Sequence, residues 1–427
     1  MKVIASTDRA FKGVLKRVTS RSAPRGSKVD NTVRTVLNAV ERGGDNAVAR
    51  YAKKFDRVSL KPAQFQITPD RVKDAYYHIR KEEGDALRYA AQRITSFHER
   101  QRTRTWMYQD DGATLGQMIV PLDAVGVYVP GGKAVYPSTI LMTVIPAKVA
   151  GVRRVAMCTP PSKEGISPYL LVAADIAGVG EIYQIGGVQA IAAMAYGTKT
   201  IPRVDKIVGP GNVYVATAKR MVYGQVDIDM IAGPSELLVV ADDAANPVHV
   251  AADLLCEAEH DEDAQVFLVT TSSRLARQVV AEMQVQVKKL SRDKIVNKSL
   301  ARHGVAFVVG TTEEAIDLAN EIAPEHLTLS VDRPFDFLEK IRNAGALFLG
   351  RYTPPAVADY VAGPNHVLPT GGTARFFSPL SLDDYVKKSN IISYSKEELA
   401  KVKVHVARMA HMEGLDAHGK SLESRRV

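Results

Sequence analysis

Residues 124–129 read AVGVYV, and this apolar run opens a series of short runs separated by helical stretches. The later runs are RRVAMC (153–158), EIYQI (181–185), DKIV (205–208), ELLVVAD (236–242) and QVFLVT (265–270). Short runs rich in β-branched residues predict strands, and the amphipathic stretches between them predict helices. Strands that alternate with helices form βαβ units, in which the strands run parallel. The sequence between residues 124 and 270 therefore predicts a parallel sheet covered by helices.

A second series of strand-like runs follows further along the chain. Its members are AFVVG (306–310), HLTLSV (326–331) and ALFLG (346–350), again with helical stretches between them. Two stacked α/β units account for both series better than one giant sheet does, because large chains divide into domains. We therefore expect an α/β fold with two Rossmann-like parallel-sheet domains.

The two ends of the chain have helical patterns instead. From residue 31 to about residue 104 the apolar residues recur at helical spacing, with a pair of glycines as an interruption. Near the other end, Ser395 and Glu398 form a capping-box pattern before a helix that we expect to reach about Met412. The sequence thus predicts a helical N-terminal region and a small helical C-terminal tail.

The overall composition is that of a folded, multi-domain protein. Of the 427 residues, 46% are hydrophobic and 24% are charged, which argues against general disorder. Lys and Arg exceed Asp and Glu by 56 − 47 = 9, which permits attraction to anionic partners. Because these basic residues are scattered along the chain, we expect a solvated surface and no nucleic-acid partner.

Cysteine content and apolar runs bear on the protein's location. Cys158 and Cys256 are the two cysteines of the chain, so there is neither a disulfide framework nor a CxxC cluster. A reducing cytoplasm suits such a chain. The longest apolar stretch, residues 139–152, is interrupted by Pro146 and Lys148, so we expect no membrane span.

One candidate site lies in ADLLCEAEH, residues 252–260, which follows a helix start at Asn246 and the next proline. Glu257 and His260 are three residues apart and share one helix face, where they could bind a metal ion together. A surface ion pair explains the same spacing. Cys256 should point about 100° away from Glu257, which favours a small buried residue over a nucleophile.

Three further segments concentrate residues that can bind metals or transfer protons. Glu325 and His326 lie in IAPEHLTL, where a helix leads into a strand, and they offer two adjacent proton acceptors. Asp359 lies in the long irregular segment from residue 358 to 381, a length at which loops are usually functional or disordered. HMEGLDAHG, from His411, follows the tail helix. A solvated loop or tail would explain each segment taken alone.

Glycine-rich turns follow most of the predicted strands. They are VPGGK (129–133), IGGVQ (185–189), GPGN (209–212) and AGPSE (232–236). Such turns can bring backbone amides against a phosphate at the start of a helix, although each could also be a structural turn. None matches GxGxxG, so a standard dinucleotide fingerprint is absent from the sequence.

Together these segments resemble the histidinol dehydrogenase family, from about residue 30 to residue 420. The resemblance is carried by VGVYVPGGKAVYPST, IGGVQAIAAMAYGT, VDKIVGPGNVYVATAK, VDIDMIAGPSE, ADLLCEAEH, IAPEHLTL, DYVAGPNHVLPTGGTARF and EGLDAHG. It implies a homodimer with shared active sites that contain one Zn²⁺ each and use two NAD molecules in turn. The implied reaction converts L-histidinol through L-histidinaldehyde to L-histidine.

The resemblance also implies a role for individual residues of this sequence. The implied zinc ligands are Glu257, His260, Asp359 and His418, and these also contact substrate. The implied catalytic pair is Glu325 and His326, the latter in contact with substrate. Further substrate contacts fall on Ser235, His366 and Glu413, and NAD contacts fall on Tyr128, Gln189 and Asn212. His366, Glu413 and His418 are expected from the partner subunit.

Four parts of the chain are expected on the same grounds. Residues 1–21 form an N-terminal extension, and residues 22–127 with 235–380 form the first α/β domain, on the zinc and substrate side. Residues 128–234 form the second Rossmann-like domain, on the NAD side. Residues 381–427 form a C-terminal dimerisation tail.

The implied chemistry suits the residue types. Removal of a hydride from an alcohol carbon requires a base for the hydroxyl proton, and histidine ordinarily titrates near neutrality, so His326 suits that task. We expect Glu325 to deprotonate the water that adds to the aldehyde, with His326 assisting. Zn²⁺ is suited to anchoring the amino and imidazole nitrogens of the substrate.

Glu257 departs from the family, in which glutamine is usual at this position. A second carboxylate beside Asp359 would balance the charge of Zn²⁺, which predicts tighter metal retention and weaker polarisation of bound ligands. Three other functions remain open: a related zinc and NAD dehydrogenase of another hydroxyl compound, a zinc hydrolase with Glu325 as base, and a basic binding protein. Dependence on NAD separates the first from the other two.

Overall fold

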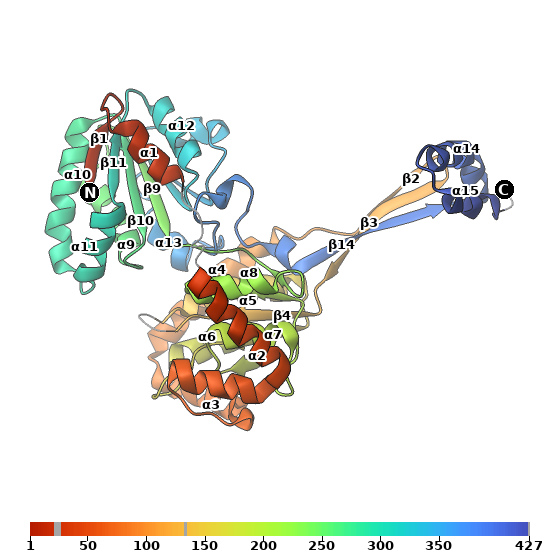
Figure 1. Cartoon of the computed structure of the whole chain (residues 1–427). Helices are drawn as coiled ribbons and strands as arrows, with labels where there is room; N and C mark the ends of the chain where they lie inside the picture. The colour runs from red at the N-terminus through yellow and green to blue at the C-terminus, as the bar shows by residue number, and fades with distance from the viewer. Residues whose placement is uncertain (21–26, 132–134, 426–427) are drawn as a thin grey trace.

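The computed structural model describes residues 1–20, 27–131 and 135–425. Two parallel sheets form separate layered units, and a long antiparallel arm projects from them (Figure 1). Part of the turn VPGGK, including Gly132 and Lys133, lies outside the described residues. Among the helices described, none combines the length and the apolar content that a membrane crossing requires.

The first unit is a six-stranded parallel sheet with the order β1-β11-β10-β9-β12-β13. Its strands are β1 (Lys2–Ala5), β9 (Glu236–Ala241), β10 (Gln265–Thr270), β11 (Val305–Val308), β12 (His326–Ser330) and β13 (Ala346–Leu349). One face packs against α9 (Pro247–Ala258), α10 (Ser273–Gln286) and α11 (Asp293–His303), and the other against α1 (Phe11–Thr19) and α12 (Thr312–Ile322). Burial on both faces explains why these strands are continuously apolar instead of alternating.

The second unit is a five-stranded parallel sheet with the order β6-β5-β4-β7-β8. Its strands are β4 (Ala124–Tyr128), β5 (Arg154–Cys158), β6 (Glu181–Tyr183), β7 (Lys206–Val208) and β8 (Asp227–Ile228). Helices α3 (Pro69–Ala75), α4 (Lys81–Glu99), α5 (Pro137–Ala150) and α6 (Pro168–Ala177) belong to one core, and α2 (Ser27–Tyr51), α7 (Gly187–Tyr196) and α8 (Val213–Val222) to the other. The two predicted α/β units are thus confirmed.

The predicted domain boundaries differ from this arrangement. Helices α2 to α4 pack on the five-stranded sheet, whereas we had expected residues 22–127 beside the six-stranded one. The apolar stripe of α2, which includes Val33, Val36 and Val40, lies in one core with the small side chains of α7. Residues 1–21 also contribute more than an extension, because β1 pairs with β11 along its whole length.

The arm consists of three antiparallel strands in the order β14-β3-β2, with two helices at its tip (Figure 1). Its elements are β2 (Trp106–Asp110), β3 (Ala113–Pro121), β14 (Val386–Tyr394), α14 (Lys396–Met412) and α15 (Asp416–Glu423). A tight turn at Asp111 and Gly112, both with positive φ (44° and 91°), joins β2 to β3. Residues 381–425 are therefore a short 3-10 helix and a strand followed by two helices, and not a purely helical tail.

Two predicted helix starts are confirmed. The side chain of Asn246 accepts a hydrogen bond from the amide of Val248 at the start of α9, and Ser395 accepts one from the amide of Glu398 at the start of α14. The remaining short elements are α13 (Pro355–Tyr360), η1 (Ala52–Asp56), η2 (Pro62–Gln64), η3 (Tyr76–His78), η4 (Val287–Lys289), η5 (Pro334–Lys340), η6 (Thr373–Arg375) and η7 (Leu382–Tyr385).

Candidate active site

The candidate residues gather at the amino edge of the six-stranded sheet. Glu236 begins β9, His326 begins β12, and Glu257 lies in the last turn of α9, which runs back toward the start of β9. Ligands of open α/β sheets usually bind beyond the carboxyl ends of the strands, so this site lies at the opposite edge of its own sheet. It faces the irregular segment 361–381, which follows α13.

Glu325 is a buried carboxylate held by the neighbouring strand. Its Oε2 accepts a hydrogen bond of 2.9 Å from the amide of Glu236. Burial, with the negative charge of Glu257, raises the pKa of Glu325 well above its ordinary value, although the amide of Glu236 opposes the shift. A carboxylate with a raised pKa is a stronger base, and a divalent cation nearby would bring its pKa back down.

His326 is fixed in one orientation by the same backbone. Its Nδ1 lies 3.0 Å from the carbonyl oxygen of Glu236, so Nδ1–H donates and Nε2 carries the lone pair. The same Nδ1 lies 3.6 Å from Oε2 of Glu257 and 3.8 Å from Oε2 of Glu325. The ring rests against Phe348, with 5.7 Å between centroids. The imidazole is therefore oriented to use Nε2 as its reactive nitrogen.

His260 follows the end of α9 and is oriented in a similar way. Its Nδ1 lies 3.2 Å from the carbonyl oxygens of both Cys256 and Glu257, which again leaves the lone pair on Nε2. Burial disfavours protonation, but the carboxylates of Glu257 and Asp359 outweigh it, so the pKa of His260 is raised. Cys256 is half-buried, and burial raises the pKa of its thiol to about 12, as suits an unreactive residue.

Asp359 and His366 come from α13 and the segment after it. Nδ1 of His366 lies 3.0 Å from the carbonyl oxygen of Asp359. Burial lowers the pKa of His366, and burial raises the pKa of Asp359 against the opposing effect of His326 and His366. These mutual effects on pKa place Asp359 close to His260, His326 and His366 in one electrostatic cluster.

Glu257 is the residue best placed to bind a cation. Within the described part of the chain its Oε1 is buried without a hydrogen-bond partner, and an orphaned carboxylate oxygen of this kind suits a metal ion. Donor atoms of Glu257, Glu325 and His326 lie within 4.8 Å of one another. Carboxylates with imidazoles whose Nδ1 is already occupied by a carbonyl are typical zinc-binding groups. The residues present therefore fit a divalent cation.

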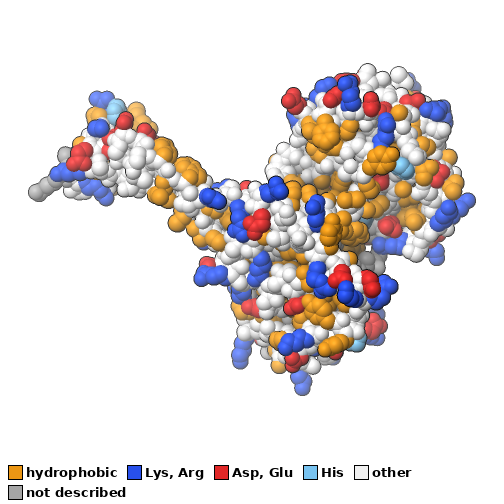
Figure 2. Space-filling view, turned by 180° about the vertical axis from the view of Figure 1, so that it is seen from behind, with side chains coloured by type: hydrophobic (Ala, Val, Ile, Leu, Met, Phe, Trp, Pro, Cys, Tyr) orange, Lys and Arg blue, Asp and Glu red, His pale blue; other side chains and the backbone are white. Residues whose placement is uncertain are grey.

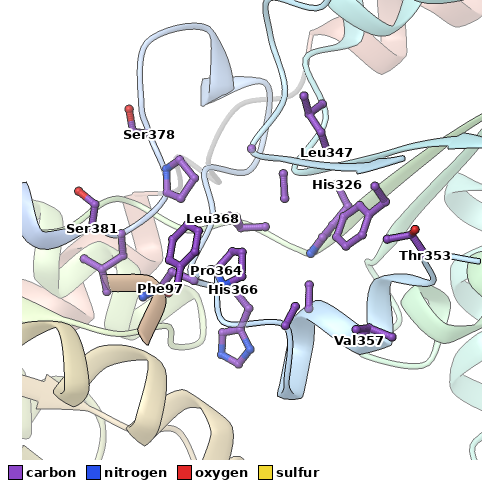
Figure 3. A pocket seen from close by; sticks show the side chains of 18 of the residues that line it. Phe97, His326, Leu347, Thr353, Val357, Pro364, His366, Leu368, Ser378 and Ser381 are labelled. Atoms are coloured by element: carbon purple, nitrogen blue, oxygen red, sulfur yellow. The ribbon is translucent and has the colours of Figure 1, made fainter. Parts of the chain in front are cut away.

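A cavity of about 450 Å³ opens beside this cluster. Figure 3 shows the ring of His326 extending from β12 into the cavity and His366 at its lower side, near Pro364. The other walls are mostly apolar and include Phe97 of α4, Leu347 and Leu368. A concave, largely apolar space with a few convergent polar groups is typical of a small-molecule site.

The expected substrate contacts fall in two places. Ser235 directly precedes β9, and its carbonyl accepts the amide of Gln265. His366, expected from a partner subunit, lies instead in the cavity of its own chain, because the segment after α13 folds back over the amino edge of the sheet. Glu413 and His418 are exposed at the tip of the arm, far from this cavity (Figure 1).

The expected NAD contacts lie in the five-stranded unit. Tyr128 ends β4, and its hydroxyl accepts the amide of Gly187 at 3.0 Å. Gln189 is fully buried, and its Nε2 donates to Asp56 at 3.0 Å. Asn212 caps α8 by accepting the amides of the next turn. These residues lie at or just after the carboxyl ends of β4, β6 and β7, the edge where open sheets usually bind ligands.

Glu236 is the residue that we did not identify from the sequence. Its side chain is fully buried, and Oε1 accepts the amide of Gly371 in the segment after α13. Its backbone orients both Glu325 and His326. The available signal was a carboxylate at the first position of a strand that is otherwise entirely apolar.

The fold and the site define a class of protein: a two-unit α/β protein in which a buried Glu–His pair lies beside carboxylates that could hold a cation. The family model described as histidinol dehydrogenase matches residues 19–426. The histidinol dehydrogenase of Syntrophotalea carbinolica is 50% identical over 426 residues, covering 100% of this chain and 99% of that protein. That of Bacillus cereus is 51% identical over 398 residues, covering 93% and 92%.

A solved structure agrees with these relatives. The crystal structure of histidinol dehydrogenase from Elizabethkingia anophelis superposes with a TM-score of 0.94 at 36% identity, covering 100% of this chain and 98% of that one. The chain therefore belongs to the histidinol dehydrogenase family. It is accordingly an oxidoreductase of histidine biosynthesis.

Proposed function

We propose that the protein oxidises L-histidinol through L-histidinaldehyde to L-histidine, using two NAD molecules in turn at a site with one Zn²⁺. The observation that carries this proposal is the Glu325 and His326 pair, which the backbone of Glu236 orients beside Glu257. An acid–base pair next to a cation-binding carboxylate can serve both an alcohol and an aldehyde oxidation.

His326 acts as the base in the alcohol step. Its Nδ1–H is committed to the carbonyl of Glu236, so Nε2 accepts the proton of the substrate hydroxyl. NAD, when bound, accepts the hydride from the alcohol carbon. The charge that forms on the imidazole is stabilised by Glu257, whose Oε2 lies 3.6 Å from Nδ1.

Glu325 deprotonates the water that adds to the aldehyde. Its carboxylate would take the proton, and the amide of Glu236 holds one of its oxygens in place. His326, 3.8 Å away, assists by taking a proton again in the second oxidation. The division of the two proton transfers between neighbouring side chains lets one site perform both steps.

Glu257, His260 and Asp359 would hold the metal, with His418 of a second copy as the remaining ligand. Zn²⁺, when bound, supplies a positive charge that anchors the amino and imidazole nitrogens of the substrate. Ser235, His366 and Glu413 would contact the substrate, while Tyr128, Gln189 and Asn212 would contact NAD.

We propose a homodimer with shared active sites, and the position of Glu413 and His418 supports it. They are exposed at the tip of an arm that carries them away from the cavity of their own chain (Figure 1). Hydrophobic side chains line this arm, among them Trp106, Met107 and Ile392, which are 51%, 60% and 69% exposed (Figure 2). Such a surface favours burial against a second copy. The free cysteines suit a cytoplasmic location.

The experiment that tests the proposal follows NADH formation from L-histidinol with and without a chelator. We expect two NADH per L-histidinol, loss of turnover on chelation and recovery on addition of Zn²⁺. Turnover of another alcohol alone would support the related dehydrogenase instead. Hydrolysis of an amide or ester without NAD would overturn the proposal in favour of a zinc hydrolase.

A further inference from the structure

Helix α5 contains a proline whose position determines what the helix can bind. Pro146 lies inside α5, within the core of the five-stranded unit. In a regular helix the amide of residue 146 would bond to the carbonyl of Met142, but proline has no N–H. Met142 is fully buried, so water cannot satisfy its carbonyl. The proline thus creates a buried acceptor that requires a partner from elsewhere in the chain.

Asn365 provides that partner. Its Nδ2 donates to the carbonyl oxygen of Met142 at 2.6 Å, across 223 residues of sequence. Its Oδ1 accepts the amide of Val367 at 2.9 Å, so the side-chain amide is used at both ends. Asn365 is itself buried, with 5% of its surface exposed. A buried side chain satisfied in this way has one orientation, and it fixes the backbone on both sides of His366.

The next carbonyl of the helix also accepts a hydrogen bond from a side chain far along the sequence. The hydroxyl of Tyr385 donates to the carbonyl of Thr143 at 2.7 Å, and Tyr385 is fully buried. Tyr385 directly precedes β14, the strand that leads along the arm to the tail. One turn of α5 therefore anchors both the segment that carries His366 and the root of the arm.

We propose that Pro146 and Asn365 are a positioning pair, in which the carbonyl freed by the proline docks the His366 segment onto the other unit. The pair would set the distance between the cavity that contains His366 and the five-stranded unit, in which the proposed NAD contacts lie. This inference rests on the proposed role of His366 in substrate binding. Asn365 also borders the cavity, whereas Pro146 does not, and the positioning role assigned to both acts through the backbone of His366.

Two substitutions break the contact from opposite sides. Asn365→Ala removes the donor, and Pro146→Ala gives residue 146 an N–H that competes for the Met142 carbonyl within the helix. We expect each to lower kcat/KM for L-histidinol by about 10- to 100-fold, because displacement by about 1 Å costs this much. KM for NAD should remain unchanged. Pro146→Ala should do this without lowering the midpoint of thermal unfolding, since it restores a helical hydrogen bond.

The double variant Pro146→Ala, Asn365→Ala gives the sharpest readout. Because both changes remove one contact, the double variant should be no more impaired than Asn365→Ala alone. Asn365→Gln, which retains the amide, should recover part of the activity. Pro168→Ala is the matched control, since Pro168 begins α6 at a position where no amide hydrogen bond is needed, and it should leave kcat/KM unchanged.

The outcomes separate this inference from the proposed function. If the wild-type protein oxidises L-histidinol and Asn365→Ala does so equally well, the positioning role is wrong. Additive losses in the double variant would also overturn it. If the wild-type protein has no such activity, the coupling is still measurable in urea unfolding of the four proteins, where non-additive free energies support the docking contact and additive ones refute it.

Discussion

The backbone carbonyl of Glu236 lies 3.0 Å from Nδ1 of His326, and this contact joins the start of β9 to the proposed catalytic pair. The amide of the same residue donates to Glu325. The two backbone groups of Glu236, its amide and its carbonyl, therefore orient both of the proposed proton-transfer side chains. Because parallel pairing of β9 with β12 fixes this register, the sheet itself orients the pair.

Glu325→Gln tests whether Glu325 and His326 serve different proton transfers. Glutamine retains an oxygen that can accept the amide of Glu236, but it cannot take a proton from water. We expect aldehyde oxidation to fall by about 100- to 10,000-fold and the first NADH from L-histidinol to form at a much less affected rate. Rapid-mixing measurements of NADH from each substrate separate the steps. The control is Glu321→Gln, at an exposed carboxylate of α12.

Full-rate aldehyde oxidation by Glu325→Gln would show that another group activates the water. An equal loss in both steps would instead assign Glu325 to a role common to both, such as holding substrate. Loss in the second step alone is the result that the geometry predicts, since His326 keeps its contact with the carbonyl of Glu236 in this variant.

Glu257→Gln tests the effect of the additional carboxylate. The change removes one negative charge from a nearly fully buried position, so Zn²⁺ should bind more weakly by about 10-fold or more. The charge of Glu257 also raises the pKa of Glu325, so the metal-free variant should titrate Glu325 at lower pH. Competition with a chelator measures the affinity. Glu259→Gln, two residues further along, is the control.

Unchanged zinc affinity together with unchanged L-histidinol kinetics in Glu257→Gln would refute the charge argument. A weaker zinc affinity with faster turnover would support it in full. That result is expected because a site with less negative charge polarises bound groups more strongly.

The sequence allowed the strands to be predicted because continuous apolar runs bounded by turns leave few alternatives. The partners of the N-terminal helices could not be predicted, since an apolar stripe such as that of α2 shows that a helix is buried but not against which surface. The arm escaped detection because β2 is exposed at every residue and its pattern has no buried face. The turn Asp111-Gly112 was its available signal.

Only part of the site could be predicted from the sequence, because sequence patterns reveal side chains and not backbone groups. Glu257, His260, Glu325 and His326 are residue types that carry chemistry, so their spacing attracted attention. Glu236 acts through its amide and carbonyl, which every residue type but proline possesses, and no pattern of side chains reveals such a role. His366 was expected from the partner subunit and lines the cavity of its own chain, because sequence does not show how a long segment folds back.

A mixture of two variants that each fail to form L-histidine tests whether chains share their active sites, with L-histidine formation as the activity measured. Glu325→Gln has a defective cavity and an intact tail, while His418→Ala has an intact cavity and a defective tail. In a mixed dimer with exchanged tails, one site combines the intact cavity with the intact tail. After denaturation and refolding together, we expect about a quarter of the wild-type activity, since half the dimers are mixed and each has one sound site.

No recovery in the mixture would show that each chain completes its own site. The control is refolding of each variant alone, which should form almost no L-histidine. Mixing Glu325→Gln with His326→Ala provides a second control, because two defective cavities cannot complement each other through their tails. Recovery in that second mixture would point to contamination with wild-type protein and not to shared sites.

Asp56 gives a prediction about pH. Burial raises the pKa of this carboxyl to about 6, despite the hydrogen bond from Gln189. Since the carboxyl ionises near pH 4 in the unfolded chain, the folded state binds the proton more tightly, and the free energy of unfolding falls as pH rises from about 4 to above 6. Asp56→Asn removes this titration and keeps an oxygen that can accept the Gln189 amide.

We therefore expect Asp56→Asn to be more stable than the wild-type protein at pH 7, by about 1 kcal/mol after allowance for the partial exposure of Asp56. The difference should shrink progressively as the pH is lowered toward 4. Urea unfolding of both proteins at several pH values measures it, with Asp70→Asn, at an exposed carboxylate, as the control. A difference that is constant with pH would show that Asp56 is ionised as readily in the folded protein as in the unfolded chain. Because Gln189 is one of the proposed NAD contacts, the same variant should also bind NAD with less dependence on pH between 5 and 7.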